Sequence, residues 1–282
     1  MLLAAAGCRE GRVGATTRPA IRPTVASLVP GASDLLLGMG AGDHLVAVSN
    51  YDVGRDETRG LPRVGDYQQI DWEQIALLKP DVLIVFMAAE RMPPALRDRA
   101  EQLSIRLVNI RTERLEDVFD ELAKLGEVVN ERAKAAEAAG KLRGQLDAVR
   151  KRVEGRPAVP TLMVREKSAD AVVGRGNFLD DVLEIAGGEN VIKAGGWPAI
   201  DRETLLSLRP AAVLVLLPDA SPQVVQEAAR VWQAMPQGAG TEKRRVHILT
   251  EWWVVQPGMH LGELAQRFAD LLHPAARSGP KP

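Results

Sequence analysis

Aromatic side chains that follow predicted strands are the residues of this sequence best suited to hold a ligand. Aromatic residues make up only 4% of the chain, yet several fall in loops after strands. Open parallel sheets bind ligands at that end of their strands, and a stacked ring adds about 0.5–1.5 kcal/mol beyond the burial of its area. The residues are Tyr51, Tyr67, Trp197, Trp252 and Trp253. They predict a site for a bulky, partly planar molecule; the alternative is that each ring only closes a core.

Catalytic signatures are missing from the sequence. It contains no HExxH motif, no GxSxG nucleophile elbow and no GxxxxGK[ST] phosphate loop. His44, His247, His260 and His273 are scattered, with no carboxylate at metal-ligand spacing. His44 is expected in a solvated loop, and His260, close to Trp252 and Trp253, is the only histidine considered as a metal ligand. Because no nucleophile or base is indicated, the sequence predicts a protein that is not an enzyme and has no resident metal or cofactor.

Composition and charge exclude several further classes. The 282 residues carry 36 basic and 37 acidic side chains, a formal net charge of −1, whereas nucleic-acid-binding proteins carry a basic excess. With 46% hydrophobic and 26% charged residues, the chain has the make-up of a folded protein. No apolar run reaches the roughly 20 residues that cross a bilayer, and a single Cys excludes an internal disulfide. We therefore expect two folded domains that bind no nucleic acid.

Short apolar strands alternate with helices in two stretches of the chain. Strands are predicted at 25–29, 45–48, 82–86 and 106–110, and again at 161–164, 212–217 and 246–249. Between the two sets lies a helical stretch that Gly126 is expected to interrupt, with Asn130 as the N-cap of a second helix that ends at Val153. That helix would be about 35 Å long, enough to span two domains. The pattern predicts an α/β fold of two Rossmann-like lobes joined by a long bridging α-helix.

The expected domain boundaries follow from these elements. The N-terminal α/β lobe covers 24–112, the bridging helical segment 113–155, and the C-terminal α/β lobe 156–274, followed by a loose tail at 275–282. Residues 1–23 contain Ala-Ala-Ala-Gly-Cys, which resembles the end of a bacterial lipoprotein signal. Cys8 is therefore expected to be lipidated, with a flexible tether after it; the alternative is an ordinary exposed thiol.

An internal repeat relates the two lobes. Residues 70–80 (IDWEQIALLKP) match residues 200–210 (IDRETLLSLRP) at a constant offset of 130, and each copy is followed by a strand. Asp71 and Asp201 are expected to be helix N-caps, which places Glu73 and Glu203 in the first turn, near the positive end of the helix dipole. Duplication explains the match better than independent capping of two helices.

Several motifs resemble those of the helical-backbone solute-binding proteins of ABC importers for cobalamin and iron chelates. These motifs are 25–35 (VASLVPGASDL), 40–49 (GAGDHLVAVS), 61–65 (LPRVG), 79–81 (KPD) and 186–190 (AGGEN). The cobalamin-binding members also carry Ser-x-Tyr where Ser49 to Tyr51 stand, an aromatic residue at Tyr67, Trp-Pro at Trp197, and a Trp at 252 or 253. The resemblance covers about residues 24–272.

The resemblance implies a fold, a ligand site and partners. It implies that Pro30 and the five aromatic residues line a cleft between the lobes, and that the bridging helix limits closure to a small rocking motion. It also implies that Glu73 and Glu203, one on each lobe, dock into arginine pockets of an ABC permease dimer. The expected protein is a periplasmic or cell-surface monomer that touches the membrane only through an N-terminal lipid anchor.

The nature of the ligand stays open at this stage. The resemblance favours a corrinoid, which would bring its own cobalt. Arg165, Lys167 and Arg175 stand where the cobalamin-binding members are more aromatic, and Tyr67 replaces a Trp, so a ferric siderophore or haem is the alternative. His260 with Tyr51 or Tyr67 is a candidate ligand set for the metal of such a molecule. A sensor domain of the same fold is a further alternative, whereas a cluster-bearing oxidoreductase would need more cysteines than the chain has.

Overall fold

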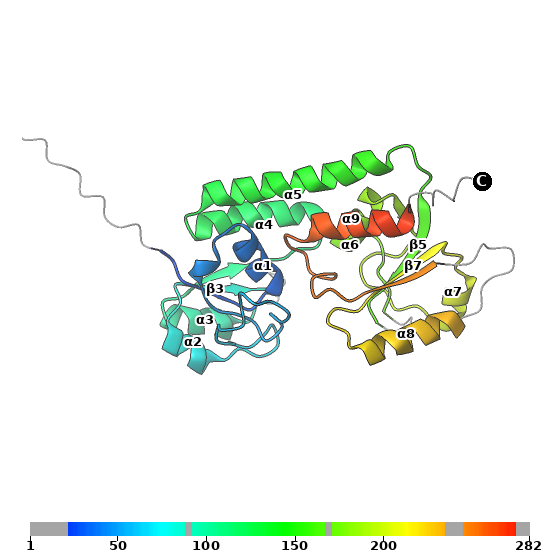
Figure 1. The fold of residues 1–282 in the computed structure, drawn as a ribbon. Helices are drawn as coiled ribbons and strands as arrows, with labels where there is room; N and C mark the ends of the chain where they lie inside the picture. The colour runs from blue at the N-terminus through cyan, green and yellow to red at the C-terminus, as the bar shows by residue number, and fades with distance from the viewer. Residues whose placement is uncertain (1–21, 88–91, 167–170, 235–244, 275–282) are drawn as a thin grey trace, which may run out of the picture.

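Two parallel sheets form the framework of the protein. The computed structural model describes residues 22–87, 92–166, 171–234 and 245–274, and Figure 1 shows two α/β lobes beside each other beneath a long helix. The first sheet has four strands in the order β2-β1-β3-β4, and the second has four in the order β6-β5-β7-β8. The predicted fold of two α/β lobes joined by a long helix is confirmed.

The elements follow the chain in two similar sets. The first lobe contains β1 (Val25–Ser27), α1 (Pro30–Gly38), the 3-10 turn η1 (Gly42–His44), β2 (Leu45–Ala47), α2 (Trp72–Leu78), β3 (Val82–Val85), α3 (Pro94–Gln102) and β4 (Arg106–Asn109). The connecting helices are α4 (Leu115–Val128) and α5 (Arg132–Val153). The second lobe contains β5 (Val159–Val164), α6 (Phe178–Ile185), β6 (Gly188–Asn190), α7 (Arg202–Ser207), β7 (Ala212–Leu216), α8 (Pro222–Ala234), β8 (Arg245–Leu249) and α9 (Leu261–Leu272). Within the described ranges, no helix is both long and apolar enough to span a bilayer.

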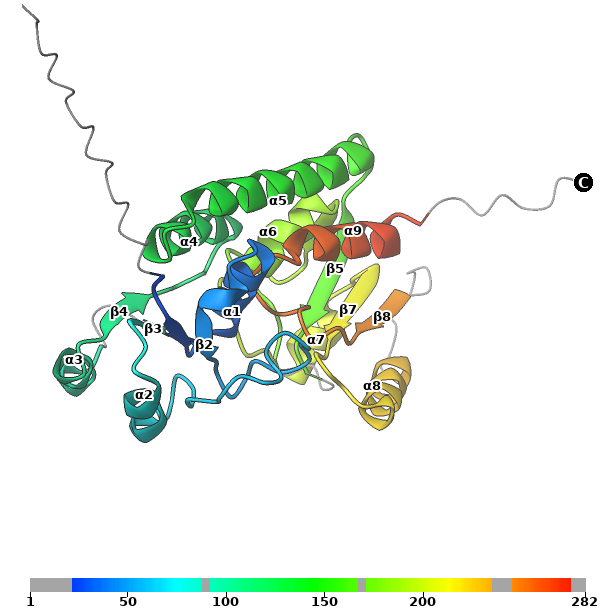
Figure 2. The same ribbon diagram turned by 60° about the vertical axis from the view of Figure 1, so that its left-hand side comes forward.

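The central strands are continuous apolar runs because helices cover both faces of each sheet. Every residue of β3 and β7 is buried. Side chains alternate between the faces of a strand, so Val82 and Ile84 join the core under α4 and α5, whereas Leu83 and Val85 join the core under α2 and α3. Figure 2 shows α4 and α5 on one side of the sheets and α2, α3 and α8 on the other. Parallel sheets require such double cover.

One apolar core runs through both lobes. It includes Leu35 of α1, Leu122 of α4, Leu142 of α5, Leu214 of β7 and Phe268 of α9, all of them fully buried. Helix α5 packs against α4 and α9 along its length. Because a dense core resists shear, we expect the lobes to rock through small angles rather than to swing on an open hinge.

The repeated segments fold alike, as their sequences predict. Asp71 is the N-cap of α2, and its side chain accepts a hydrogen bond of 2.9 Å from the backbone N–H of Gln74. Asp201 is the N-cap of α7 and accepts one of 2.6 Å from the backbone N–H of Thr204. Both helices cover the sheet face opposite to the one beneath α4 and α5. The repeat therefore presents one first-turn glutamate from each lobe.

Two predictions around the long helices were wrong. Gly126 does not interrupt α4, which continues to Val128. A Cβ at Gly126 would lie 2.5 Å from the Cβ of Ala135, so the glycine lets α4 and α5 pack closely. Asn130 is not the N-cap of α5, since it lies in the turn with φ 61° and Glu131 is the N-cap. Asn tolerates the left-handed conformation better than most residues do.

The expectation of a solvated His44 was also wrong. Its ring is 2% exposed, and Nδ1 lies 2.7 Å from the carbonyl oxygen of Pro23. The histidine therefore fastens the segment before β1 to the lobe, a contact that local sequence does not reveal. Trp232 of α8 is 1% exposed, and Trp72 packs at the edge of the core under α2 and α3.

Buried Glu121 makes the stability of the protein depend on pH. Its side chain in α4 is 6% exposed and accepts a hydrogen bond from the Thr112 hydroxyl. Burial raises the pKa of Glu121 from 4.5 to about 7. The folded protein holds this proton more tightly than the unfolded chain does. Glu121 therefore contributes favourably to the free energy of unfolding at pH values below its pKa in the unfolded chain. This contribution is lost as the pH rises through the folded pKa.

We expect Glu121→Gln to stabilise the protein at pH 8 by on the order of 1–3 kcal/mol and to have little effect at pH 5. Urea unfolding of both proteins at several pH values checks this. Glu137→Gln on the exposed face of α5 is the matched control and is expected to leave the free energy of unfolding unchanged at both pH 5 and pH 8. An equal effect of Glu121→Gln at pH 5 and pH 8 would contradict the assignment. Asp52, whose pKa burial raises to about 6, contributes a smaller slope of the same sign in both proteins.

Candidate functional site

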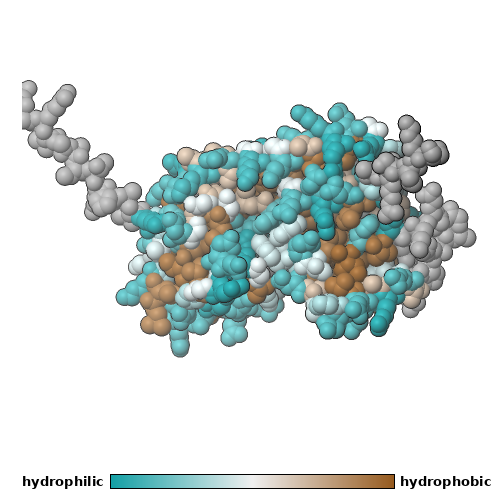
Figure 3. All heavy atoms as spheres, viewed as in Figure 1, coloured by the Kyte–Doolittle hydropathy of each residue, from teal (hydrophilic) through white to brown (hydrophobic). Residues whose placement is uncertain are grey.

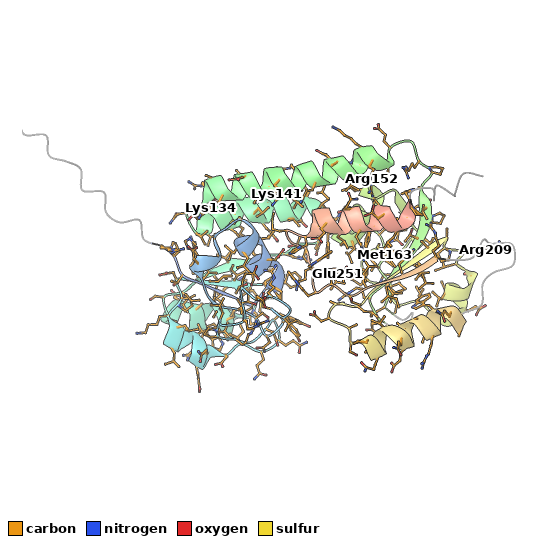
Figure 4. The ribbon with its side chains drawn as sticks, viewed as in Figure 1. Lys134, Lys141, Arg152, Met163, Arg209 and Glu251 are labelled. Atoms are coloured by element: carbon orange, nitrogen blue, oxygen red, sulfur yellow. The ribbon has the colours of Figure 1, made fainter. Side chains whose placement is uncertain are left out.

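The loops that follow the strands of the two sheets meet between the lobes. A Cβ at Gly31, after β1, would lie 2.8 Å from the carbonyl oxygen of Pro257, and one at Gly54, after β2, would lie 2.8 Å from Cγ of Trp252. Figure 4 places Glu251 between the lobes, and the outline of the molecule is notched there in Figure 3. The carboxyl ends of both sheets therefore face one interlobe cleft, where parallel sheets bind ligands. Half-buried Pro30 begins α1, directly before Gly31.

Two tyrosines form the aromatic surface of the first lobe. Tyr51 and Tyr67 are 48% and 53% exposed, and their rings stack with centroids 5.9 Å apart. Asp66 accepts hydrogen bonds from the backbone N–H groups of Gln68 and Gln69, at 2.8 and 3.1 Å, and so holds the Tyr67 loop. The negative charge of Asp66 raises the pKa of Tyr51. Both phenols thus offer a flat face together with a hydroxyl group.

Trp197 is the matching ring of the second lobe. It is 48% exposed, and the guanidinium carbon of Arg165 lies 4.5 Å from its ring centroid. Burial lowers the pKa of Arg165, yet a guanidinium stays charged at neutral pH. Tyr67 and Trp197 occupy equivalent places before the two repeats, so each lobe contributes an exposed ring from the same loop.

A buried amide network supports the loop that carries Trp197. Asn190 donates to the carbonyl oxygens of Val173 and Gly174, at 3.0 and 3.1 Å, and to Asp180 at 3.1 Å. Asn177 caps α6 and donates to the carbonyl oxygen of Gly196 at 3.2 Å. Paired groups of this kind rigidify a loop because each would be costly to leave unsatisfied. Sequence reasoning missed this role, although Asn190 ends the Gly-Gly-Glu-Asn motif.

The two tryptophans after β8 differ from each other. Trp253 is 8% exposed and lies in the core, stacked on His260 with centroids 5.3 Å apart. A ring enclosed in this way supports the wall of a cleft instead of offering a free face. Trp252 is half-buried, and the guanidinium of Arg55 lies 4.1 Å from its ring centroid. Trp252 therefore contacts the other lobe, which its place in the sequence did not reveal.

His260 points its ring nitrogens at carboxylates. Nδ1 lies 3.4 Å from Glu263 and Nε2 lies 3.7 Å from Asp34. Burial lowers the pKa of His260. In the part of the chain that the structure describes, no three His, Cys, Asp or Glu side chains gather in a way that could hold a metal ion. Nδ1 of His260 therefore faces Glu263 and Nε2 lies near Asp34 without a hydrogen bond, so the histidine borders the buried ion-pair region behind Trp252.

An exposed phenylalanine was also missed by sequence reasoning. Phe86 follows β3 directly and is 45% exposed. The sequence places it in the strand, where it would be covered. Because it lies at the carboxyl end of β3, it belongs to the same edge of the sheet as Tyr51. In the sequence, the only feature that could have indicated its exposure is its position at the end of an apolar run.

Glu73 and Glu203 are exposed in the first turns of α2 and α7. Neither forms an ion pair within the described ranges. The lobes therefore present two unpaired carboxylates on helices that lie away from the bridging helix (Figure 1). Cys8, predicted as a lipidation site, and Lys167 lie outside the described residues.

The comparison with protein families decides which class of protein has this arrangement. The model of the family described as periplasmic binding protein matches residues 25–249. The chain belongs to the periplasmic binding protein family. Its members are solute-binding proteins and not enzymes, so the expected class and the absence of catalytic motifs agree with this assignment.

Two curated relatives of this periplasmic binding protein are named vitamin B12-binding proteins. A vitamin B12-binding protein of Vibrio vulnificus is 27% identical over 204 residues, which covers 72% of each chain. A vitamin B12-binding protein of Pectobacterium carotovorum is 25% identical over 263 residues and covers 91% of each chain. The matches extend across both lobes.

Solved structures share the architecture. A periplasmic haem-binding protein from Pseudomonas aeruginosa has a TM-score of 0.75 and 25% identity, and the match covers 91% of this chain and 95% of that one. A periplasmic vitamin B12-binding protein of Vibrio cholerae has a TM-score of 0.72 and 23% identity, with 89% and 96% covered. Since both ligands occur among proteins of this shape, the fold alone does not select between them.

Proposed function

We propose that this periplasmic binding protein captures a corrinoid in the interlobe cleft and delivers it to an ABC permease. The observation that carries the proposal is the pair of exposed rings, Tyr67 and Trp197, at equivalent places on the two lobes. A large conjugated macrocycle offers stacking area to both rings at once, and such contacts are favourable beyond simple burial. The names of the curated relatives support the same ligand class.

The proposed ligand set joins both lobes. In the proposed site, the exposed rings of Tyr51 and Tyr67 contact the ligand from the first lobe and that of Trp197 from the second; Pro30, Trp252 and the buried Trp253 complete the set. The corrinoid brings its own cobalt, and the protein needs no resident cofactor for capture. Binding of this kind relies on shape and stacking, with few polar groups to set orientation.

Haem or a ferric siderophore is the second candidate. The observation in its favour is Arg165 beside Trp197, because a guanidinium pairs well with carboxylates. The tyrosine hydroxyl groups of Tyr51 and Tyr67 are also suitable ligands for iron. The haem-binding neighbour at 25% identity supports this candidate.

The partner and location follow from the same proposal. Glu73 and Glu203 engage cationic pockets on a permease dimer, so that one binding-protein monomer contacts both permease subunits. The protein works in the periplasm or at the cell surface, held by a lipid on Cys8. A sensor domain of the same fold would bind the ligand and support no uptake, so transport assays separate the two roles.

Isothermal titration of the purified protein with cyanocobalamin, cobinamide, haem and a ferric siderophore tests the ligand class. We expect cyanocobalamin to bind one to one with a Kd in the micromolar range or below, and haem and the siderophore to bind at least about tenfold more weakly. Cobinamide, which lacks the lower nucleotide, reports how much of the affinity comes from the corrin ring. Saturable binding of haem alone would replace the corrinoid by the second candidate, and no binding in any titration would refute both.

A further inference from the structure

A buried ion pair lies directly behind the ring of Trp252. Asp34 of α1 and Arg55 are paired, and their side chains are only 3% and 6% exposed. The guanidinium of Arg55 lies 4.1 Å from the centroid of the Trp252 ring. Asp34 and Arg55 belong to the first lobe, whereas Trp252 follows β8 of the second sheet. The contact between Arg55 and Trp252 therefore joins the two lobes.

The segment after Trp252 is fastened to the same face of α1. Asp34 accepts a hydrogen bond from the backbone N–H of Met259. A Cβ at Gly31 would lie 2.8 Å from the Pro257 carbonyl oxygen, and one at Gly38 would overlap Cγ of Met259. Because these glycines lie on either side of Asp34 on one helical face, residues 257–259 pack closely against that face of α1, through the Pro257 backbone at Gly31 and the Met259 side chain at Gly38. The position of Asp34 is thus fixed from both lobes.

The loop that carries Arg55 is held at its base. Asp52 is buried and accepts hydrogen bonds from the backbone N–H of Ser49 at 3.0 Å and from the hydroxyl of Ser33 at 3.1 Å. Gly54 has φ +76° and packs on the Trp252 side chain, which excludes a larger residue at this point. The loop is therefore held in one conformation, and this conformation places the Arg55 guanidinium against the Trp252 indole.

Space remains beside the indole. A cavity of about 680 Å³ is lined by Asp34, Arg55, Lys141, Trp252 and Glu263, among others. Figure 4 shows Lys141 on the bridging helix above the lobes. Without the guanidinium, the indole would have room to move toward this cavity. The contact with Arg55 therefore restricts the ring beside this cavity, while the His260 ring meets the indole edge-on with centroids 5.0 Å apart.

We propose that Arg55, held by Asp34, is a positioning residue that fixes the Trp252 indole as a wall of the ligand cleft. The inference rests on the proposed function for its effect on affinity, but the position of the ring is a property of the ligand-free protein. Arg55 suits this role because its planar guanidinium stacks on the ring while its edge pairs with the carboxylate. Its burial strengthens the attraction, since little water competes for the cation.

The test is a double-mutant cycle in which one change replaces the Asp34–Arg55 pair and the other replaces Trp252. The variant pair Asp34→Asn with Arg55→Met removes both charges, so no unpaired buried charge threatens folding. We expect this change to weaken cyanocobalamin binding by about tenfold or more and to have less than about twofold effect in a Trp252→Phe background. Arg143→Met, which removes the guanidinium 4.1 Å from the Phe119 ring on the bridging helices, is the matched control and should leave affinity unchanged.

Near-ultraviolet circular dichroism of the ligand-free proteins gives a readout that does not depend on the ligand. The tryptophan bands should change when Asp34 and Arg55 are replaced, and the change should be absent in the Trp252→Phe background. Arg55→Lys, which keeps the charge without the planar group, should restore only part of the signal. Unchanged bands would overturn the inference, as would equal losses of affinity in both backgrounds. If no corrinoid binds to the wild-type protein, the proposed function fails while the spectra still decide the role of Arg55.

Discussion

Reversing both exposed carboxylates, Glu73→Arg with Glu203→Arg, is expected to abolish ligand uptake and to leave ligand affinity unchanged. The two side chains lie on separate lobes and have no ion-pair partner among the described residues. Charge-assisted hydrogen bonds contribute roughly 1.5–3 kcal/mol each, and reversal replaces two such contacts by repulsion. Uptake in cells that carry the cognate permease and a parallel titration of the purified variant measure the two effects.

The control for this prediction is a double variant with the same change of net charge at another part of the surface. Glu137→Arg with Glu154→Arg alters two exposed acids on and after the bridging helix, on the side away from α2 and α7. We expect normal uptake from it. Single reversals at Glu73 or Glu203 should give intermediate uptake, because one lobe still docks. Normal uptake by the double variant would mean that both acids only stabilise the first turns of their helices.

Removing the two equivalent rings, Tyr67→Ala with Trp197→Ala, is expected to weaken ligand binding by at least about a hundredfold. Truncation of a central aromatic residue in a binding site costs roughly 2–4 kcal/mol, and each tenfold in Kd corresponds to about 1.4 kcal/mol. Folding should be spared, because the side chains are 53% and 48% exposed. Isothermal titration of the single and double variants, together with their thermal unfolding midpoints, measures both effects.

Val231→Ala provides the comparison for the ring variants. Val231 is an exposed apolar residue of α8, 40% accessible, and its truncation should change neither affinity nor midpoint. The single ring variants should each lose part of the affinity, since one lobe still stacks on the ligand. Wild-type affinity in the double variant would place the ligand elsewhere on the protein.

Sequence patterns predict the local elements well because the governing contacts are local. The apolar run at 82–86 indicates a strand buried on both faces, which forms over Val82–Val85, and Asp71 and Asp201 cap their helices as the repeat predicts. The conformations that tertiary packing decides were not predictable. Gly126 and Asn130 are an example, since close packing of α4 on α5 determines both.

The residues of the candidate site also fall into two groups, those that local sequence predicts and those that only tertiary packing brings together. Tyr51, Tyr67 and Trp197 are exposed where loops after strands predict them. Nothing near Asp34 or Arg55 in the sequence, in contrast, indicates that either residue has a partner in the other lobe. Their contacts with Trp252 and Met259 bring together residues from the two ends of the chain. Only the folded structure brings such partners together.

A crystal structure of the protein with cyanocobalamin, with the cobalt located by its anomalous signal, tests the central claim most directly. The account predicts one cobalt site between the lobes, with the corrin ring in contact with Tyr67 and Trp197. Cobalt bound outside the interlobe cleft, for example in the groove between α4, α5 and α6 that Arg114 and Lys151 line, would contradict it.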